Sequence, residues 1–273
     1  MNVVIKSNAE QVASCAYAFL RERMGRGGCR VLGLPTGSTP VALYKEAIAG
    51  VRRGELDFSA VHTFNLDEYL GLPPEHPQSY RRFMAENLFN HVNIKAENID
   101  FLSGLPADIA AECTRYEKAI QALGGIDLQI LGIGRDGHIG FNEPGTSLAS
   151  RTHEATLTQE TIADNQRFFG AGEEVPRWSL TMGVGTILDA REILLLATGA
   201  SKAEAVAAMI EGPVSSLCTA SALQLHAKVT IIIDAAAAAR LTRADYYRWI
   251  AENDSRMAAY VAERRQHYLG AKA

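Results

Sequence analysis

The chain has 273 residues, of which 47% are hydrophobic and 21% are charged, and its formal net charge is −4. This composition is ordinary for a folded globular protein and excludes a disordered, collagen-like or low-complexity chain. The slight acidic excess, in a sequence without any Lys- or Arg-rich block interleaved with aromatic residues, argues against nucleic acid as a partner.

The first predicted element is a helix over the apolar stretch from Val12 to Leu20, whose apolar residues have helical spacing. Its polar start argues against a secretory signal peptide. No later apolar run approaches the roughly 18 to 20 residues that span a bilayer, so we expect no membrane segment. The four cysteines are scattered without CxxC spacing, which argues against a disulfide framework and fits a reducing cytoplasm.

Short apolar runs further along the chain predict strands that are buried on both faces, with helical patterns between them. This alternation predicts an α/β fold with a mostly parallel sheet and helices on both faces. We see no repeat or linker, so we expect a single domain over 1–273, ending in a helix at about 242–268. The predicted strands are 30–34, 61–64, 127–133, 193–197 and 229–233.

The loop after the first of these strands has the features of an anion site. It runs through Thr36, Gly37, Ser38 and Thr39 into a helical pattern with Pro40 in its first turn. Free backbone N–H groups at a helix start, together with the helix dipole and nearby hydroxyls, favour a bound anion. The alternative is a plain capped turn between a strand and a helix.

Two cations could complete this anion site. Ser201 to Glu204 has the pattern of a capping box after the strand at 193–197, which would place Lys202 in a first helical turn. A cation there opposes the helix dipole, which favours a bound anion over a solvated lysine. Arg167 lies in the polar segment 145–178, which lacks a strong period and is interpreted as a mobile cover over the site.

The stretch 132–137 reads GIGRDG and matches the G-x-G-x-x-G pattern of dinucleotide-binding loops. That pattern has to open a helix, whereas residues 138–145 are too rich in glycine and proline for a helix interior. The same loop instead brings together Asp136, His138 and Glu143, a combination typical of proton transfer. The alternative is a structural loop with capping carboxylates.

A second carboxylate pair, Asp67 and Glu68, follows the strand at 61–64. Adjacent side chains in extended structure point to opposite faces, so we expect one of the two to enter the site, and sequence geometry leaves both choices open. No grouping of His, Cys, Asp or Glu has a metal-ligand spacing such as HExxH, and no serine lies in a G-x-S-x-G elbow. We therefore expect neither a metal site nor an acyl-serine mechanism.

Taken together, the segments 34–40, 64–69 and 131–144 resemble the signature segments of the glucosamine-6-phosphate deaminase family, and the resemblance extends to about residue 234. It implies a Rossmann-like sheet of the type shared with ribose-5-phosphate isomerase. It also implies conversion of glucosamine 6-phosphate and water into fructose 6-phosphate and ammonia, without a redox cofactor.

The resemblance also implies roles for individual residues. Asp67 would move a proton from C2 to C1 of the sugar, and His138, oriented by Asp136 and Glu143, would open the pyranose ring. Gly137 would contact the substrate. The phosphate would be held by the loop containing Gly37, Ser38 and Thr39, together with Arg167 and Lys202.

One departure from the family concerns regulation. Members that are activated by N-acetylglucosamine 6-phosphate carry basic side chains just after a Ser-Arg-Thr motif, where this chain has His153, Glu154 and Ala155. We therefore predict hyperbolic kinetics without that activator.

The sequence leaves the oligomeric state open between a monomer and a homo-oligomer. The final helix carries a stripe of apolar residues, which we expect to pack on its own domain, with a subunit contact as the alternative. Two alternative functions also stay open: an enzyme for a related sugar such as galactosamine 6-phosphate, and a sugar-phosphate sensor. The stripe consists of Tyr246, Ile250, Met257, Val261 and Tyr268.

Overall fold

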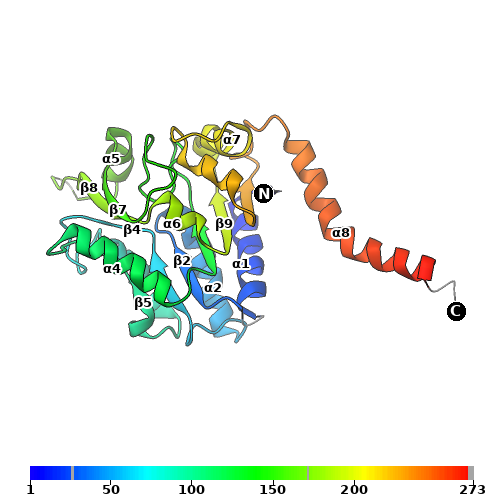
Figure 1. Cartoon of the computed structure of the whole chain (residues 1–273), viewed down its shortest axis with the longest axis horizontal. Helices are drawn as coiled ribbons and strands as arrows, with labels where there is room; N and C mark the ends of the chain where they lie inside the picture. Colours follow the sequence, from blue (N-terminus) through cyan, green and yellow to red (C-terminus); the bar gives the residue numbers. More distant parts are fainter. Residues whose placement is uncertain (26–27, 171, 270–273) are drawn as a thin grey trace.

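The computed structural model describes residues 1–25, 28–170 and 172–269. Its centre is a seven-stranded parallel sheet in the order β1-β10-β9-β6-β2-β3-β5 (Figure 1). The strands of this sheet are β1 (Asn2–Lys6), β2 (Val31–Leu34), β3 (His62–Asn65), β5 (Ile99–Asp100), β6 (Leu128–Leu131), β9 (Glu192–Ala197) and β10 (Val229–Asp234). The helices are α1 (Ala9–Gly25), α2 (Ser38–Arg52), α3 (Tyr80–Asn87), α4 (Ile109–Ala122), α5 (Gln159–Gln166), α6 (Val184–Leu188), α7 (Ala203–Glu211) and α8 (Ala244–Leu269).

The central strands are largely apolar because both faces of the sheet are covered. In β9, Ile193 and Leu195 join the core on the face of α4, α6 and α7, while Leu194 and Leu196 join the core on the face of α1, α2 and α3. This alternation is the period of two that a pleated strand imposes. The predicted mostly parallel sheet with helices on both faces is confirmed.

All five predicted strands are present, with ends shifted by one or two residues. The sequence did not reveal β1 or the two-residue β5, which are the edge strands of the sheet. It also missed a separate three-stranded antiparallel sheet formed by β4 (Asp67–Tyr69), β8 (Trp178–Thr181) and β7 (His153–Thr156). These strands are too short for apolar periodicity to identify them.

The polar segment 145–178 contains regular structure, namely β7, α5 and the start of β8. A small apolar cluster anchors it to the body of the protein, with Tyr69 and Phe141 on one side and Leu157 and Phe169 on the other. The segment therefore has regular structure despite its weak period. Its interpretation as a mobile cover over the site stays a prediction. Its polar composition reflects a surface element held by few apolar contacts.

The last helix, α8, extends away from the rest of the protein (Figure 1). Among the described side chains of α8, Ala244 and Tyr247 at its start pack on the core, so the expectation that the helix packs on its own domain holds for its start. Further along, Trp249 and Met257 are more than half exposed, and the side chain of Tyr268 lies outside the described part. In the described ranges, neither α8 nor any other helix is long and apolar enough to cross a lipid bilayer.

Candidate active site

A cavity of about 480 Å³ lies at the carboxyl ends of the parallel strands, the place where open α/β sheets bind ligands. Its walls are the loops that follow β2, β3, β6 and β9, together with α5 and the residues just after it. The cavity therefore collects side chains from segments that lie far apart in the sequence. The predicted site residues that line it are Thr36, Gly37, Ser38, Thr39, Asp67, Asp136, His138, Arg167 and Lys202.

The loop after β2 forms a cradle of backbone amides. Gly37 adopts a φ of 100°, which favours glycine, and occupies the cap position before α2. No side chain caps this helix start within the described ranges, so its first N–H groups are available to a ligand. The hydroxyl of Tyr44 donates a hydrogen bond to the carbonyl oxygen of Pro35 at 2.5 Å and holds the loop in place. The geometry is that of an anion site.

Both predicted cations line the same cavity. Lys202 ends a short 3-10 helix (Ala200–Lys202) and occupies the cap position of α7. Burial lowers the pKa of Lys202, because its charge is partly removed from water. The predicted capping box was wrong: no side chain caps α7 in the part of the chain described, because Ser201 lies within the 3-10 turn and Lys202 occupies the cap position.

Arg135, in the loop after β6, also lines the cavity, although it was not among the predicted site residues. Its guanidinium donates a hydrogen bond to the carboxylate of Asp164 at 2.9 Å and lies 3.7 Å from that of Glu160. These contacts join the loop after β6 to α5. The position of Arg135 just after a predicted strand could have identified it as a cavity residue from the sequence.

The two adjacent carboxylates of β4 have different surroundings. Asp67 lines the cavity, whereas Glu68 accepts hydrogen bonds from the backbone N–H groups of Tyr69, Tyr80 and Arg81 at 2.9–3.0 Å. Two of these donors belong to the first turn of α3, so Glu68 caps that helix. The structure thus places one of the pair in the site, as strand geometry requires.

Asp67 is 6% exposed. Burial and the neighbouring charge of Glu68 raise its pKa to about 8, although the positive charge of His138 acts in the opposite direction. A carboxyl group with a pKa near neutrality can both accept and return a proton at physiological pH. This property fits Asp67 for a proton-transfer role.

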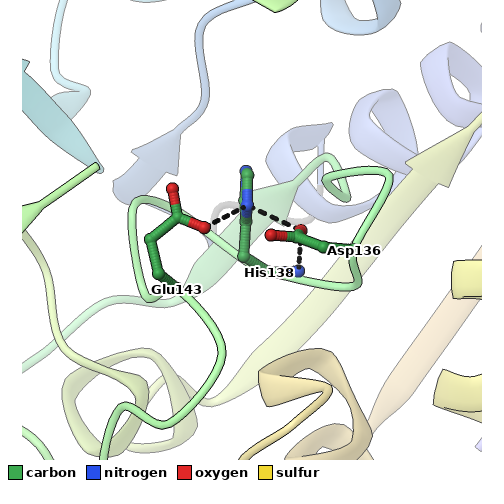
Figure 2. Close-up of side chains that lie close together, drawn as sticks. All are labelled: Asp136, His138 and Glu143. Atoms are coloured by element: carbon green, nitrogen blue, oxygen red, sulfur yellow. Dashed lines mark hydrogen bonds and ion pairs between the residues drawn. The ribbon is translucent and has the colours of Figure 1, made fainter. Parts of the chain in front are cut away.

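His138 forms a compact cluster with two carboxylates (Figure 2). Its Nδ1 lies 2.8 Å from Oδ1 of Asp136 and 3.2 Å from Oε2 of Glu143, and its backbone N–H donates to Asp136 at 3.1 Å. Because both carboxylates meet Nδ1, this nitrogen carries a proton and Nε2 remains for a ligand. Burial alone would lower the pKa of His138, but the two carboxylates raise it to about 9.

The ligand atoms of Asp136, His138 and Glu143 lie within 4.8 Å of one another, so they form a grouping that could hold a metal ion. Two ligands of a tetrahedral zinc ion would lie about 3.3 Å apart, since each is about 2 Å from the metal. The separation of 2.8 Å between Asp136 and His138 is instead that of a direct hydrogen bond. The geometry therefore fits a shared proton better than a metal.

The glycines of this loop have steric roles. A Cβ at Gly134 would lie 2.5 Å from the His138 ring, and one at Gly137 would lie 2.5 Å from Sγ of Cys218. Gly137 is not among the described residues that line the cavity, so its predicted contact with the substrate has no counterpart in this geometry. A dinucleotide-binding loop leads directly into a helix, but residues 138–150 after this loop contain turns and no helix. The rejection of a dinucleotide site therefore agrees with the structure.

Comparison with known proteins places this geometry in context. Residues 2–232 match the family model of glucosamine-6-phosphate isomerases and 6-phosphogluconolactonases. The chain is 54% identical to a glucosamine-6-phosphate deaminase of Hahella chejuensis over 250 residues, which cover 92% of this chain and 95% of the relative. It is 51% identical to the corresponding protein of Cellvibrio japonicus, covering 94% and 98% of the two chains.

Two solved structures resemble this chain in fold. A structure described as a monomeric glucosamine-6-phosphate deaminase superposes with a TM-score of 0.85 at 43% identity, covering 88% of this chain and 100% of that one. The 6-phosphogluconolactonase of Trypanosoma brucei superposes with a TM-score of 0.70 at 19% identity, over 88% and 98% of the two chains. This second likeness concerns the fold alone.

Proposed function

Because the chain belongs to the family of glucosamine-6-phosphate isomerases and 6-phosphogluconolactonases, we propose that it converts glucosamine 6-phosphate and water into fructose 6-phosphate and ammonia. The observation that carries the proposal is the layout of the cavity. One cavity of about 480 Å³ is lined by the anion cradle, by two cations, and by the proton-transfer groups Asp67 and His138. A phosphorylated amino sugar has matching groups at its two ends.

The phosphate group anchors the substrate. Its oxygens accept hydrogen bonds from the backbone N–H groups at the start of α2 and from the hydroxyls of Ser38 and Thr39, while Lys202 and Arg167 balance its charge. Binding at this remote group holds the flexible open-chain sugar in a reactive geometry. Hydrolysis of the phosphate ester plays no part in the reaction.

His138 opens the pyranose ring. With a pKa of about 9, the imidazole is protonated at pH 7, so its Nε2 first gives a proton to the ring oxygen and then takes the proton of the anomeric hydroxyl. The imidazole is therefore unchanged at the end of the step. Asp136 and Glu143 act through Nδ1, since they orient the ring and stabilise its protonated form. Glu143 is only 6% exposed and does not line the cavity, so it contacts the imidazole and not the substrate.

Asp67 then transfers hydrogen along the open chain. Its carboxylate removes the proton at C2 and delivers it to C1, while the ammonium group on C2 gives one proton to the oxygen on C1. The product is an iminium group at C2. Water adds to this group to form a carbon that bears both nitrogen and hydroxyl, and ammonia leaves to produce the ketone.

The protonation state of Asp67 is coupled to the substrate. With a pKa of about 8, this carboxyl group is mainly protonated at pH 7 in the empty cavity. The positive charge of the substrate ammonium group favours the carboxylate, because an adjacent opposite charge lowers the pKa of an acid. Substrate binding thereby produces the base that the reaction needs.

We extend the proposal to domain organisation and compartment. The whole chain is treated as one domain, since the cavity draws on loops from residue 35 to residue 202. The four unpaired cysteines fit a reducing compartment such as the cytoplasm.

The test is an assay of ammonia release from glucosamine 6-phosphate and, in parallel, from galactosamine 6-phosphate. We expect turnover of the glucosamine substrate and a loss of roughly 10³-fold in rate for Asp67→Asn, since general acid–base catalysis typically supplies about 10² to 10⁴. Glu86→Gln, an exposed substitution on α3, is the matched control. No ammonia release from glucosamine 6-phosphate would refute the proposal, and equal rates for wild type and Asp67→Asn would remove Asp67 from the mechanism.

A further inference from the structure

The extended helix α8 carries exposed apolar side chains on one face, a stripe that shares Tyr246, Met257 and Val261 with the predicted one and adds Trp249 and Tyr260. Exposed fractions are 54% for Tyr246, 59% for Trp249, 56% for Met257, 57% for Tyr260 and 49% for Val261. At 100° per residue, these positions lie within about 120° of one another around the helix axis. Large apolar side chains gathered on one exposed helix face mark an interaction surface.

The helix is an addition to the part of the chain that forms the cavity. The family model ends at residue 232, before α8 begins. The deaminase structure described as monomeric is covered over its whole length by 88% of this chain. In Figure 1 the helix leaves the body near α7 and runs away from the sheet. Its stripe therefore needs a partner other than the core of its own subunit.

The charges along α8 indicate which partner fits. In the sequence, the first half (244–255) has three acidic residues and one arginine, whereas the second half (256–269) has three arginines and one glutamate. A second copy in the antiparallel direction would place each acidic half beside a basic half. A parallel copy would place like charges together, at a cost in stability.

We propose that α8 pairs with α8 of a second copy of this chain in the antiparallel direction and forms a two-fold symmetric dimer. A helix of 26 residues is about 39 Å long, and its midpoint falls beside Met257. The two-fold axis passes near this residue, so the same apolar face serves both subunits. The bodies of the two subunits then lie at opposite ends of the helix pair. No described residue of α8 lines the cavity, so the pairing leaves both cavities uncovered by the helices.

The first test compares two neighbouring substitutions. Val261→Glu introduces a charge into the apolar stripe, whereas Ala262→Glu places the same charge about 100° further around the helix, on an exposed position outside it. By light scattering, we expect wild type and Ala262→Glu to have twice the mass of one 29.6 kDa chain, and Val261→Glu to have the mass of one. Circular dichroism and deaminase activity should be the same for all three.

We expect Val261→Glu to raise the dissociation constant of the dimer by at least about tenfold, which corresponds to a loss of about 1.4 kcal/mol in binding free energy. A wild-type protein that has the mass of a single chain at all concentrations would overturn the proposal. So would a Val261→Glu protein that keeps the mass of two chains, because the dimer would then use another surface.

A charge-exchange experiment tests the antiparallel direction. One variant carries Arg256→Glu and Arg265→Glu, and the other carries Glu252→Lys and Asp254→Lys; at 100° per residue all four positions lie beside the stripe and not in it. Each variant alone places like charges together and should be monomeric, whereas an equal mixture should recover the mass of two chains, since each reversed half meets a complementary one. Variants that dimerise alone, or a mixture that stays monomeric, would refute antiparallel pairing.

Discussion

Asp67 and Glu68 show how adjacent residues of one type acquire different roles. Both are buried carboxyl groups in β4, and burial raises the pKa of each. Glu68 accepts three backbone hydrogen bonds and belongs to the framework of α3, whereas Asp67 faces the cavity. The pleat of the strand separates the two side chains, and the surrounding elements then decide which one faces the cavity.

The buried carboxyl group of Asp67 should cost stability at neutral pH. Because its pKa is about 8 in the folded protein and about 3.8 when unfolded, the unfolded chain ionises first and stability falls as pH rises across this window. We predict that Asp67→Asn melts at a higher temperature than wild type at pH 8, by about 2–4 °C for each kcal/mol gained. The difference should shrink towards pH 4.

Thermal unfolding followed by circular dichroism at pH 4.5, 6 and 8 measures this effect. Asp57→Asn is the control, because hydrogen bonds from Ser59 lower the pKa of Asp57 and its substitution should not stabilise the protein as pH rises. Equal melting temperatures of wild type and Asp67→Asn at pH 8 would contradict the prediction.

The raised pKa of His138 should depend on its two carboxylate neighbours. Glu143→Gln removes one negative charge 3.2 Å from Nδ1 and leaves Asp136 in place. We predict that the pKa of His138 falls from about 9, because burial of the imidazolium is then opposed by one carboxylate instead of two. An NMR titration of the imidazole signals measures the shift. An unchanged His138 titration would assign the raised pKa to Asp136 alone.

At the scale of elements, the anion cradle is formed by residues that are close in the sequence, whereas the position of α5 at the cavity depends on contacts with distant residues. The strand β2, the glycine loop and the start of α2 follow one another in the chain, so their pattern is visible in the sequence. By contrast, α5 reaches the cavity through an ion pair between Asp164 and Arg135, 29 residues apart. Short-range patterns carry no information about such a contact.

The start of α7 should contribute to phosphate binding through Lys202. We predict that Lys202→Met lowers kcat/KM for glucosamine 6-phosphate by roughly 10- to 150-fold, since a hydrogen bond to a charged group contributes about 1.5–3 kcal/mol. Steady-state kinetics measure the loss. Lys228→Met, on an exposed lysine outside the cavity lining, is the control and should behave as wild type. Equal losses in both variants would argue against a phosphate contact at Lys202.

At the scale of the whole molecule, the body of the protein and α8 differ in how they are stabilised. The body has two apolar cores on either side of the parallel sheet. Beyond its first turn, α8 leaves Trp249, Met257, Tyr260 and Val261 about half exposed. The candidate active-site cavity and the proposed dimer surface are therefore separate, since no described residue of α8 lines the cavity.

The prediction that an acetylated sugar phosphate does not regulate this chain depends on the residues after its Ser-Arg-Thr motif, which differ from the basic residues of the activated members. His153, Glu154 and Ala155 occupy β7, and Arg151 is engaged by the carboxylates of Glu117 and Asp189. We predict a hyperbolic dependence of rate on glucosamine 6-phosphate that N-acetylglucosamine 6-phosphate does not change. Initial-rate curves with and without the effector measure this. A sigmoidal curve that the effector makes hyperbolic would contradict it.

The sequence by itself determined the layers of the fold and the kind of chemistry. Apolar runs that alternate with helical patterns require a covered parallel sheet, and the loops at the ends of β2 and β6 already contain the anion cradle and the cluster around His138. These features depend on neighbours within a few residues, which the order of amino acids records directly.

Only the tertiary structure decided the surroundings of Asp67 and Glu68, the link between Arg135 and α5, and the exposure of the stripe on α8. Each of these depends on contacts, or on their absence, between segments far apart in the chain. Burial, pKa and ion pairing follow from such contacts because they depend on which atoms replace water around a side chain.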